Sequence, residues 1–191
     1  MPSLEVLQQL RVLVVHPRDP DGETIIRHIQ RVGCQVEVMW PPPVKLPERI
    51  DVVFYLIDER TRHALPWFAD QPPAAIVAVV QHDAPDIIGL LTDCSPQAVV
   101  SKPAEPFGIL TSLIVARNIF RYEERLHTKV RKIEDTIRSV RMVEKAKTIL
   151  MKSKNLEEKE AYEYLRKHAM NKRVPIGKVA STIIDASDLL D

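Results

Sequence analysis

The spacing of apolar residues divides the chain into two halves of different character. In the first half, short apolar or alternating runs predict β-strands, with helical patterns between them. The predicted strands cover residues 11–15, 35–39, 51–57, 75–80 and 98–100. A helical pattern over residues 22–32 follows the first strand, with Gly33 as its C-cap. Strands and helices in this order predict an α/β fold whose five strands form a doubly wound sheet.

The second half of the chain is predicted to be helical. No proline occurs between Pro106 and Pro175, although the chain contains 15 prolines. Pro106 suits the first turn of a helix, where a missing N–H costs no hydrogen bond, so we predict a long helix from Pro106 to about Lys152. Asn155 and Glu158 then form the capping box of a second helix, and Pro175 opens a third. Each has one apolar face, which predicts a small three-helix bundle.

A heptad pattern runs along the predicted long helix. Its apolar positions are spaced 7, 4, 3, 4 and 3 residues apart, which is the a/d spacing of a coiled coil. The positions are Ile119, Leu126, Val130, Ile133, Ile137 and Val140. Glu123 is the one polar residue of this seam. A seam of this kind needs a second helix, so we predict a homodimer, either parallel or antiparallel. A helix that packs back on its own domain is the alternative.

The predicted elements divide the chain into three segments, which cover residues 1–105, 106–139 and 140–191. Charge is distributed unevenly between the two halves of the chain. Residues 1–116 hold 9 Lys/Arg and 14 Asp/Glu, whereas residues 117–178 hold 18 and 9. An acidic half followed by a basic half indicates a control domain joined to a domain that binds a polyanion. The alternative is that helical surfaces are simply rich in charge.

Composition and motifs argue against several other classes of protein. No apolar run approaches the roughly 20 residues of a membrane span, and the first residues lack the pattern of a signal peptide. Cys34 and Cys94 are the only cysteines, so we expect a cytoplasmic setting with neither disulfide nor zinc. The 6 histidines show no metal-binding spacing, and no glycine loop or nucleophile motif occurs. We therefore expect no catalytic residues, no cofactor and no membrane contact.

The N-terminal half resembles a response-regulator receiver, a flavodoxin-like domain, in its length, strand spacing and final Lys102. Receivers that accept phosphate hold Mg²⁺ with two acids after the first strand and carry the phosphoryl group on an Asp ending the third. Here His16-Pro17 replaces the acids, and Leu56 stands at the acceptor position. The resemblance therefore implies a degenerate pseudo-receiver. Asp58, as a displaced acceptor, is the weaker alternative because Mg²⁺ would lack its acid pair.

Three short motifs lie on the three predicted C-terminal helices. They are Ala146-Lys147-x-x-Leu150-Met151, Ala161-Tyr162-x-x-Leu165 and Val179-Ala180. In order and spacing, across about residues 135–185, they resemble the ANTAR family of RNA-binding antiterminator domains. The resemblance implies a regulator of transcription termination that binds hairpins in leader RNA.

The N-terminal half extends this resemblance. Residues 31–34, 40–43 and 51–54 read Arg-Val-Gly-Cys, Trp-Pro-Pro-Pro and Asp-Val-Val-Phe. They are similar to the AmiR-type regulators of aliphatic amidase operons, in which a coiled coil joins a pseudo-receiver to an ANTAR domain. The resemblance implies control by a ligand-sensing negative regulator of the amide-binding type (AmiC-like) that sequesters the protein, in place of control by a kinase.

Basic and aromatic residues of the C-terminal segment are the candidate RNA contacts. The candidates are Lys147, Tyr164, Lys172, Arg173 and Lys178. Lys147 and Arg173 match positions of the ANTAR pattern, and Lys147 is expected near the rim of the bundle. The cations are suited to phosphates and base edges of a hairpin loop, where bases are unstacked. Tyr164 is expected to point outward and stack, whereas Tyr162 is expected to pack in the core.

Two other functions fit parts of the pattern. A DNA-binding transcriptional regulator would use the three helices as a helix-turn-helix variant, with Arg, Asn or Gln at the start of its recognition helix. Residues 175–179 read Pro-Ile-Gly-Lys-Val, which argues against that use. A coiled-coil adaptor without a nucleic-acid role would not need the excess of nine positive charges in residues 117–178. RNA binding is therefore favoured over both.

Overall fold

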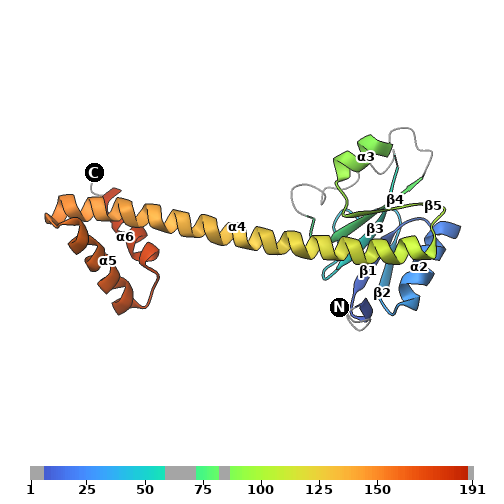
Figure 1. The fold of residues 1–191 in the computed structure, drawn as a ribbon, viewed down its shortest axis with the longest axis horizontal. Coiled ribbons are helices and arrows are strands. Elements are labelled where there is room, and N and C mark those ends of the chain that lie inside the picture. The colour runs from blue at the N-terminus through green and yellow to red at the C-terminus, as the bar shows by residue number, and fades with distance from the viewer. Residues whose placement is uncertain (1–6, 59–71, 82–86, 189–191) are drawn as a thin grey trace. The chain divides into compact units, whose positions relative to one another are not determined.

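The computed structural model describes residues 7–58, 72–81 and 87–188. The chain divides into two compact units, Met1–Glu124 and Arg125–Asp191. Figure 1 shows the first unit as a sheet flanked by helices and the second as a small helical bundle. Each unit has a hydrophobic core of its own.

The sheet of the first unit consists of five parallel strands in the order β2-β1-β3-β4-β5. The strands are β1 (Arg11–Val15), β2 (Gln35–Met39), β3 (Val52–Ile57), β4 (Ala75–Gln81) and β5 (Ala98–Lys102). Strands β3 and β4 are apolar almost throughout because both faces of the sheet are covered. This strand order is that of flavodoxin-like receivers. The predicted fold class is confirmed, and all five predicted strands are present.

Helices cover both faces of the sheet. Helix α2 (Pro20–Arg31) and the first turns of helix α4 (Pro106–Lys154) pack on one face, and helix α3 (Ile87–Cys94) lies on the other. The start of α2 is capped because the Asp19 carboxylate accepts a hydrogen bond from the backbone N–H of Gly22 at 2.8 Å. The helix ends before Gly33, whose φ of +97° suits glycine.

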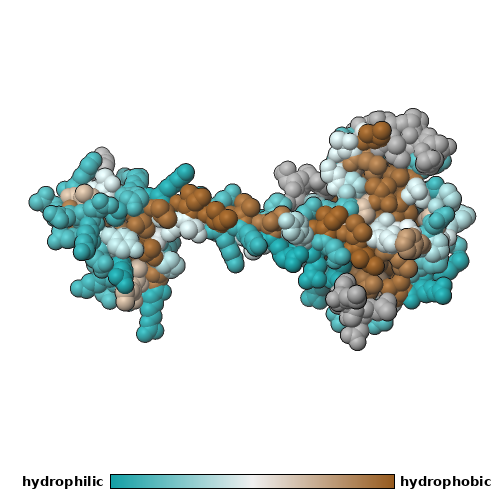
Figure 2. All heavy atoms as spheres, viewed as in Figure 1, coloured by the Kyte–Doolittle hydropathy of each residue, from teal (hydrophilic) through white to brown (hydrophobic). Residues whose placement is uncertain are grey.

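Helix α4 is one continuous helix of 49 residues. Its first turns bury Ile109, Leu113 and Ala116 against the sheet. Over residues 121–138 every side chain except that of Glu123 is exposed. The six apolar residues of the predicted seam are 39% to 59% exposed, and Figure 2 shows a line of apolar side chains (brown) along this helix. Within the described residues, no helix has both the length and the hydropathy needed to cross a membrane.

The last turns of α4 form a bundle with α5 (Glu158–Lys172) and α6 (Ile176–Asp188). The buried side chains of its core are Val143, Ala146, Leu150, Ala161, Leu165, Ala169, Val179 and Ala180. Gly177 lies so close to α4 that a Cβ atom there would be 2.4 Å from the Ser139 Oγ. Small residues thus let the last turns of α4 approach α5 and α6 closely.

The turn between α4 and α5 differs from the prediction. Asn155 follows the end of α4 with a φ of +53°, a left-handed conformation that Asn tolerates better than most residues. Helix α5 is capped at Glu157, whose backbone N–H donates to the Glu160 carboxylate at 3.0 Å. The prediction that Asn155 caps α5 is therefore wrong, because this residue reverses the chain and the capping box begins two residues later.

Candidate functional site

The carboxyl ends of the parallel strands form the edge at which doubly wound domains place their ligands. His16 follows β1 at this edge, and Lys102 ends β5. The Lys102 ammonium nitrogen lies 3.1 Å from Asp19 Oδ2 and 3.7 Å from Asp21 Oδ2. Leu56, which stands at the predicted acceptor position, is a buried apolar side chain. The edge therefore holds an ion-pair cluster and has no nucleophile at the acceptor position.

Asp19 and Asp21 belong to no motif that marks them as site residues in the sequence. Their one signal was that they are the first acidic residues after the first strand. Asp21 Oδ1 also accepts a hydrogen bond from the backbone N–H of Ala104 at 2.9 Å. Burial alone raises the pKa of Asp19, but hydrogen bonds from the Gly22 N–H and from Lys102 outweigh it and lower that pKa. Among the described residues, no three His, Cys, Asp or Glu side chains are grouped to hold a metal ion.

His16 is the buried member of this cluster. Its side chain is 0% exposed, and its Nδ1 lies 3.4 Å from Asp19 Oδ1. The Nδ1–H donates to the Pro17 carbonyl oxygen at 2.8 Å, whereas Nε2 has no hydrogen-bond partner in the described part of the chain. Burial lowers the pKa of His16, and the charge on Lys102 contributes in the same direction. The ring is therefore neutral at pH 7.

In the second unit, Lys147 is held inside the bundle. It is 8% exposed, and its ammonium nitrogen lies 2.7 Å from Glu158 Oε1 and 2.9 Å from Glu144 Oε2. Hydrogen bonds to Glu158 and then to Glu144 raise the pKa of Lys147, and the same pairing lowers the pKa of Glu158. Lys147 thus ties α4 to the first turn of α5. The sequence predicted only that Lys147 lies near the rim of the bundle, because residue spacing does not show which carboxylates approach a side chain.

The two tyrosines of α5 differ from the prediction in their exposure to solvent. Tyr162 is 45% exposed, so the prediction that it packs in the core is wrong. The adjacent Ala161 fills the core position instead. Tyr164 is partly buried: Lys154 Nζ donates to its hydroxyl at 2.8 Å, and the His168 ring centroid lies 4.1 Å from that of Tyr164. The Tyr164 ring is therefore already in contact with two side chains.

The other three predicted RNA contacts surround the turn between α5 and α6. Lys172 ends α5, Arg173 follows it, and Lys178 lies in the first turn of α6; all three are exposed. Arg173 has left-handed backbone angles, with φ 54° and ψ 41°, which cost a non-glycine residue about 1–2 kcal/mol. This is the left-handed cap at which many helices end, and the Arg173 backbone N–H donates to the carbonyl oxygens of Ala169 and Met170.

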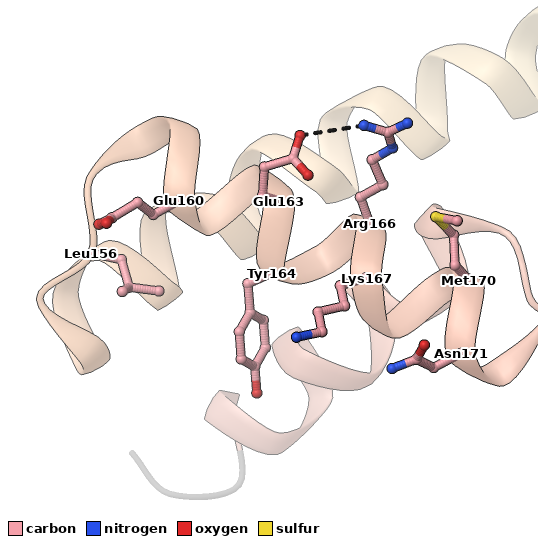
Figure 3. Close-up of a pocket in the computed structure, with 8 residues that line it drawn as sticks. All are labelled: Leu156, Glu160, Glu163, Tyr164, Arg166, Lys167, Met170 and Asn171. Atoms are coloured by element: carbon pink, nitrogen blue, oxygen red, sulfur yellow. Dashed lines mark hydrogen bonds and ion pairs between the residues drawn. The ribbon is translucent and has the colours of Figure 1, made fainter.

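A shallow hollow of about 560 Å³ lies on α5. In Figure 3, Tyr164, Lys167 and Asn171 line one side of this helix, and Arg166 reaches the Glu163 carboxylate at 3.4 Å. The lining holds two acidic and two basic side chains. Because these charges balance, the hollow does not by itself attract a polyanion.

Comparison with known proteins accounts for both units. One family model, described as AmiR, N-terminal, matches residues 10–117, which is more than half of the chain. The chain belongs to the AmiR family. A second model, the ANTAR domain, matches residues 131–184, which include the end of α4, all of α5 and most of α6. Both resemblances inferred from the sequence are therefore confirmed.

Relatives and solved structures agree with this assignment. The aliphatic amidase regulator of Pseudomonas aeruginosa is 29% identical over 181 residues, covering 93% of this chain and 92% of that protein. The transcriptional regulatory protein PdtaR of Mycobacterium tuberculosis is 22% identical over 112 residues, covering 59% and 55%. The structure of the response regulator StyR matches with a TM-score of 0.59 at 12% identity, covering 93% of this chain and 99% of that one. The last likeness is one of fold alone.

The buried His16 predicts that this AmiR-family protein loses stability as the pH falls from 7 to 5. The pKa of His16 is lowered in the folded state from 6.5, so the unfolded chain takes up the proton first. The contribution of the neutral His16 ring to the free energy of unfolding is therefore fully present above about pH 6.5. Below that pH it declines, by at most about 1.4 kcal/mol per pH unit for one proton. His16→Leu should reduce this slope, as measured by urea unfolding followed by tryptophan fluorescence.

The usual pKa of Asp19 is 3.8 and its folded value is lower. Its loss of stabilisation therefore begins below this pH window. An unchanged slope in His16→Leu would show that burial of His16 is not the cause.

Proposed function

We propose that this protein is a transcription antitermination regulator that binds hairpins in leader RNA and has no catalytic role. The observation that carries the proposal is the ANTAR match to the helical bundle, together with a receiver-like unit that has Leu56 in place of a phosphoacceptor. Two relatives are named as an aliphatic amidase regulator and as a transcriptional regulatory protein, and these names are consistent with a regulatory role. The cytoplasm is the setting in which nascent leader RNA is available.

The geometry of α6 disfavours the alternative of a DNA-binding helix-turn-helix. A recognition helix presents its N-terminal residues to base edges in the major groove. Here Gly177, Val179 and Ala180, in the first turns of α6, are buried against the rest of the bundle. Residues that are buried at the start of a helix cannot contact base edges in a major groove.

The proposed RNA contacts differ in how accessible their side chains are to RNA. Lys172, Arg173 and Lys178 are exposed around one turn, so a phosphate or a base can reach all three. Lys147 is paired with two carboxylates and Tyr164 with Lys154. In this proposal those two residues contact RNA only where RNA displaces their present partners.

The exposed seam of α4 supports a homodimer. Apolar side chains at a and d positions are stable in water only when a second helix covers them. We therefore retain the segments 1–105, 106–139 and 140–191 as pseudo-receiver, dimerisation helix and RNA-binding domain. Two RNA-binding domains in one dimer would suit two hairpins, because binding the first raises the effective concentration of the second.

Control by a partner protein fits the receiver-like unit better than control by a kinase. Lys102 is engaged by Asp19 and Asp21, and Leu56 offers no nucleophile. The relative in Pseudomonas aeruginosa is named as an aliphatic amidase regulator. We propose that a negative regulator which senses a small amide-type molecule, similar to AmiC, docks on this protein and sequesters it.

The central test compares RNA with duplex DNA. A pool of tandem hairpins with randomised loops is transcribed, and the RNA retained by the full chain becomes the probe. We expect the probe to bind at least about tenfold more tightly than duplex DNA of the same sequence, with an affinity that falls as salt rises. The same RNA, placed before a terminator, should increase read-through when the protein is added. Equal affinity for duplex DNA would contradict the proposal.

Arg173→Gly separates stability from RNA binding. Glycine adopts the left-handed conformation without a Cβ clash, so the free energy of unfolding should rise by about 1 kcal/mol. Loss of the exposed cation should weaken binding of the selected RNA roughly tenfold. Circular dichroism in urea and filter binding measure the two effects. A stabilised variant with unchanged RNA affinity would remove Arg173 from the RNA-binding surface.

A charge in the seam tests the dimer. Ile133→Asp should halve the mass measured by light scattering, because a carboxylate cannot be buried between two helices without a partner. Thr128→Asp places the same charge on α4 outside the seam and should leave the mass unchanged. A monomeric unchanged protein would refute the proposed dimer.

A further inference from the structure

The positive charge of the C-terminal unit is concentrated on one helix. Residues 125–154, all on α4, hold ten Lys/Arg and three Asp/Glu. Residues 155–188, which include α5 and α6, hold six of each. Phosphate contacts supply most of the non-specific attraction of a protein for a nucleic acid. The net excess of positive charge in this unit therefore lies on α4, whereas the exposed cations of the α5–α6 turn stand in a segment whose charges balance.

Cations recur at a fixed interval along α4. Arg131, Arg138, Lys145 and Lys152 are each seven residues apart and exposed. Seven residues are nearly two helical turns, so successive members lie about 10.5 Å apart along one line of the helix. We call Arg138, Lys145 and Lys152 the basic row. Arg141 is exposed beside it, one turn from both Arg138 and Lys145.

A hollow of about 400 Å³ adjoins the basic row. Its lining is Glu134, Ile137, Arg138, Arg141, Met142, Lys145 and Ile184, so one acidic residue faces three cations. Lys145 lies 3.6 Å from Asp188, but both side chains are more than half exposed, at 58% and 61%. Such an exposed pair contributes little and exchanges readily. Lys145 thus remains available to an anion from solution.

We propose that the basic row binds the phosphate backbone of the RNA, while the turn between α5 and α6 contacts the bases. This inference rests on the proposed antitermination function and adds a surface to it. Charge complementarity carries it, since the row lies on the segment of the unit that holds ten Lys/Arg and three Asp/Glu. The hollow on α5 has balanced charges and is not a competitor for phosphate.

The basic row is compatible with a dimer. Arg138 follows the seam residue Ile137 by one position, which is about 100° around the helix. A helix seated on the seam therefore leaves Arg138 and Lys145 accessible. Each protomer of the dimer would present one row, so two hairpins can be bound without competing for the same cations.

The test removes the three positive charges of the basic row. The full-length variant Arg138→Gln/Lys145→Gln/Lys152→Gln is compared with the control Arg18→Gln/Arg27→Gln/Lys45→Gln, which removes three exposed charges from the receiver-like unit. The probe is the selected tandem-hairpin RNA. Log–log plots of affinity against salt should lose about 2–3 units of slope in the row variant. Affinity near physiological salt should fall roughly tenfold to a hundredfold, and the control should change neither.

The preference among loop sequences distinguishes the row from the turn. Phosphate contacts position a protein without reading sequence, so the row variant should bind all selected loops more weakly and keep their ranking. Circular dichroism and light scattering check that the variant keeps its helices and its mass. Should the triple variant fail to fold, each single substitution is expected to reduce the slope by about 0.7–0.9.

The outcomes separate the two proposals. If the row variant and the control bind the RNA alike with the same slope, the inference is overturned and the antitermination proposal stands. If the unchanged protein binds none of the hairpins, the proposed function itself fails. If the substitutions weaken only the binding of duplex DNA, the row is a DNA surface, which also overturns the inference.

Discussion

Both units depend on the burial of apolar side chains along helix α4. Its first turns close one face of the sheet with Ile109 and Leu113, and its last turns supply Val143 and Leu150 to the bundle. Between these cores the helix keeps an apolar line that remains exposed in the single chain. Helices in water owe most of their stability to packing of such a face. One helix therefore completes two cores and leaves an exposed apolar line between them.

The receiver-like unit has a flavodoxin-like sheet with Leu56 at the position where receivers that accept phosphate carry an Asp. Lys102 is paired with carboxylates from the start of α2, and a buried neutral His16 lies beside them. These contacts connect the ends of β1 and β5 with the start of α2, so this edge of the sheet is occupied by the chain's own charges. A signal that reaches this unit through contact with another protein needs none of the missing groups.

In the second unit, the residues proposed to contact RNA differ in how far they are held by other side chains. Lys147 belongs to the most specific part of the ANTAR pattern, yet its present contacts tie α4 to α5. Lys172, Arg173 and Lys178, by contrast, are exposed around the α5–α6 turn. A family pattern thus combines residues that build the bundle with residues that are exposed on it, and the pattern alone does not separate them.

The sequence by itself determined the strands, the long helix and the seam, because these follow from local periodicity. It also placed Arg173 at an exposed turn, where no distant contact intervenes. Only the tertiary structure decided that Asp19 pairs with Lys102, 83 residues away, that Lys147 is enclosed, and that Tyr162 faces solvent. Those outcomes depend on which elements meet in space and on one-residue differences in helix phase. Periodicity predicts that a helix has a buried face, but the approach of its neighbours decides which polar groups lie at the edge of that face.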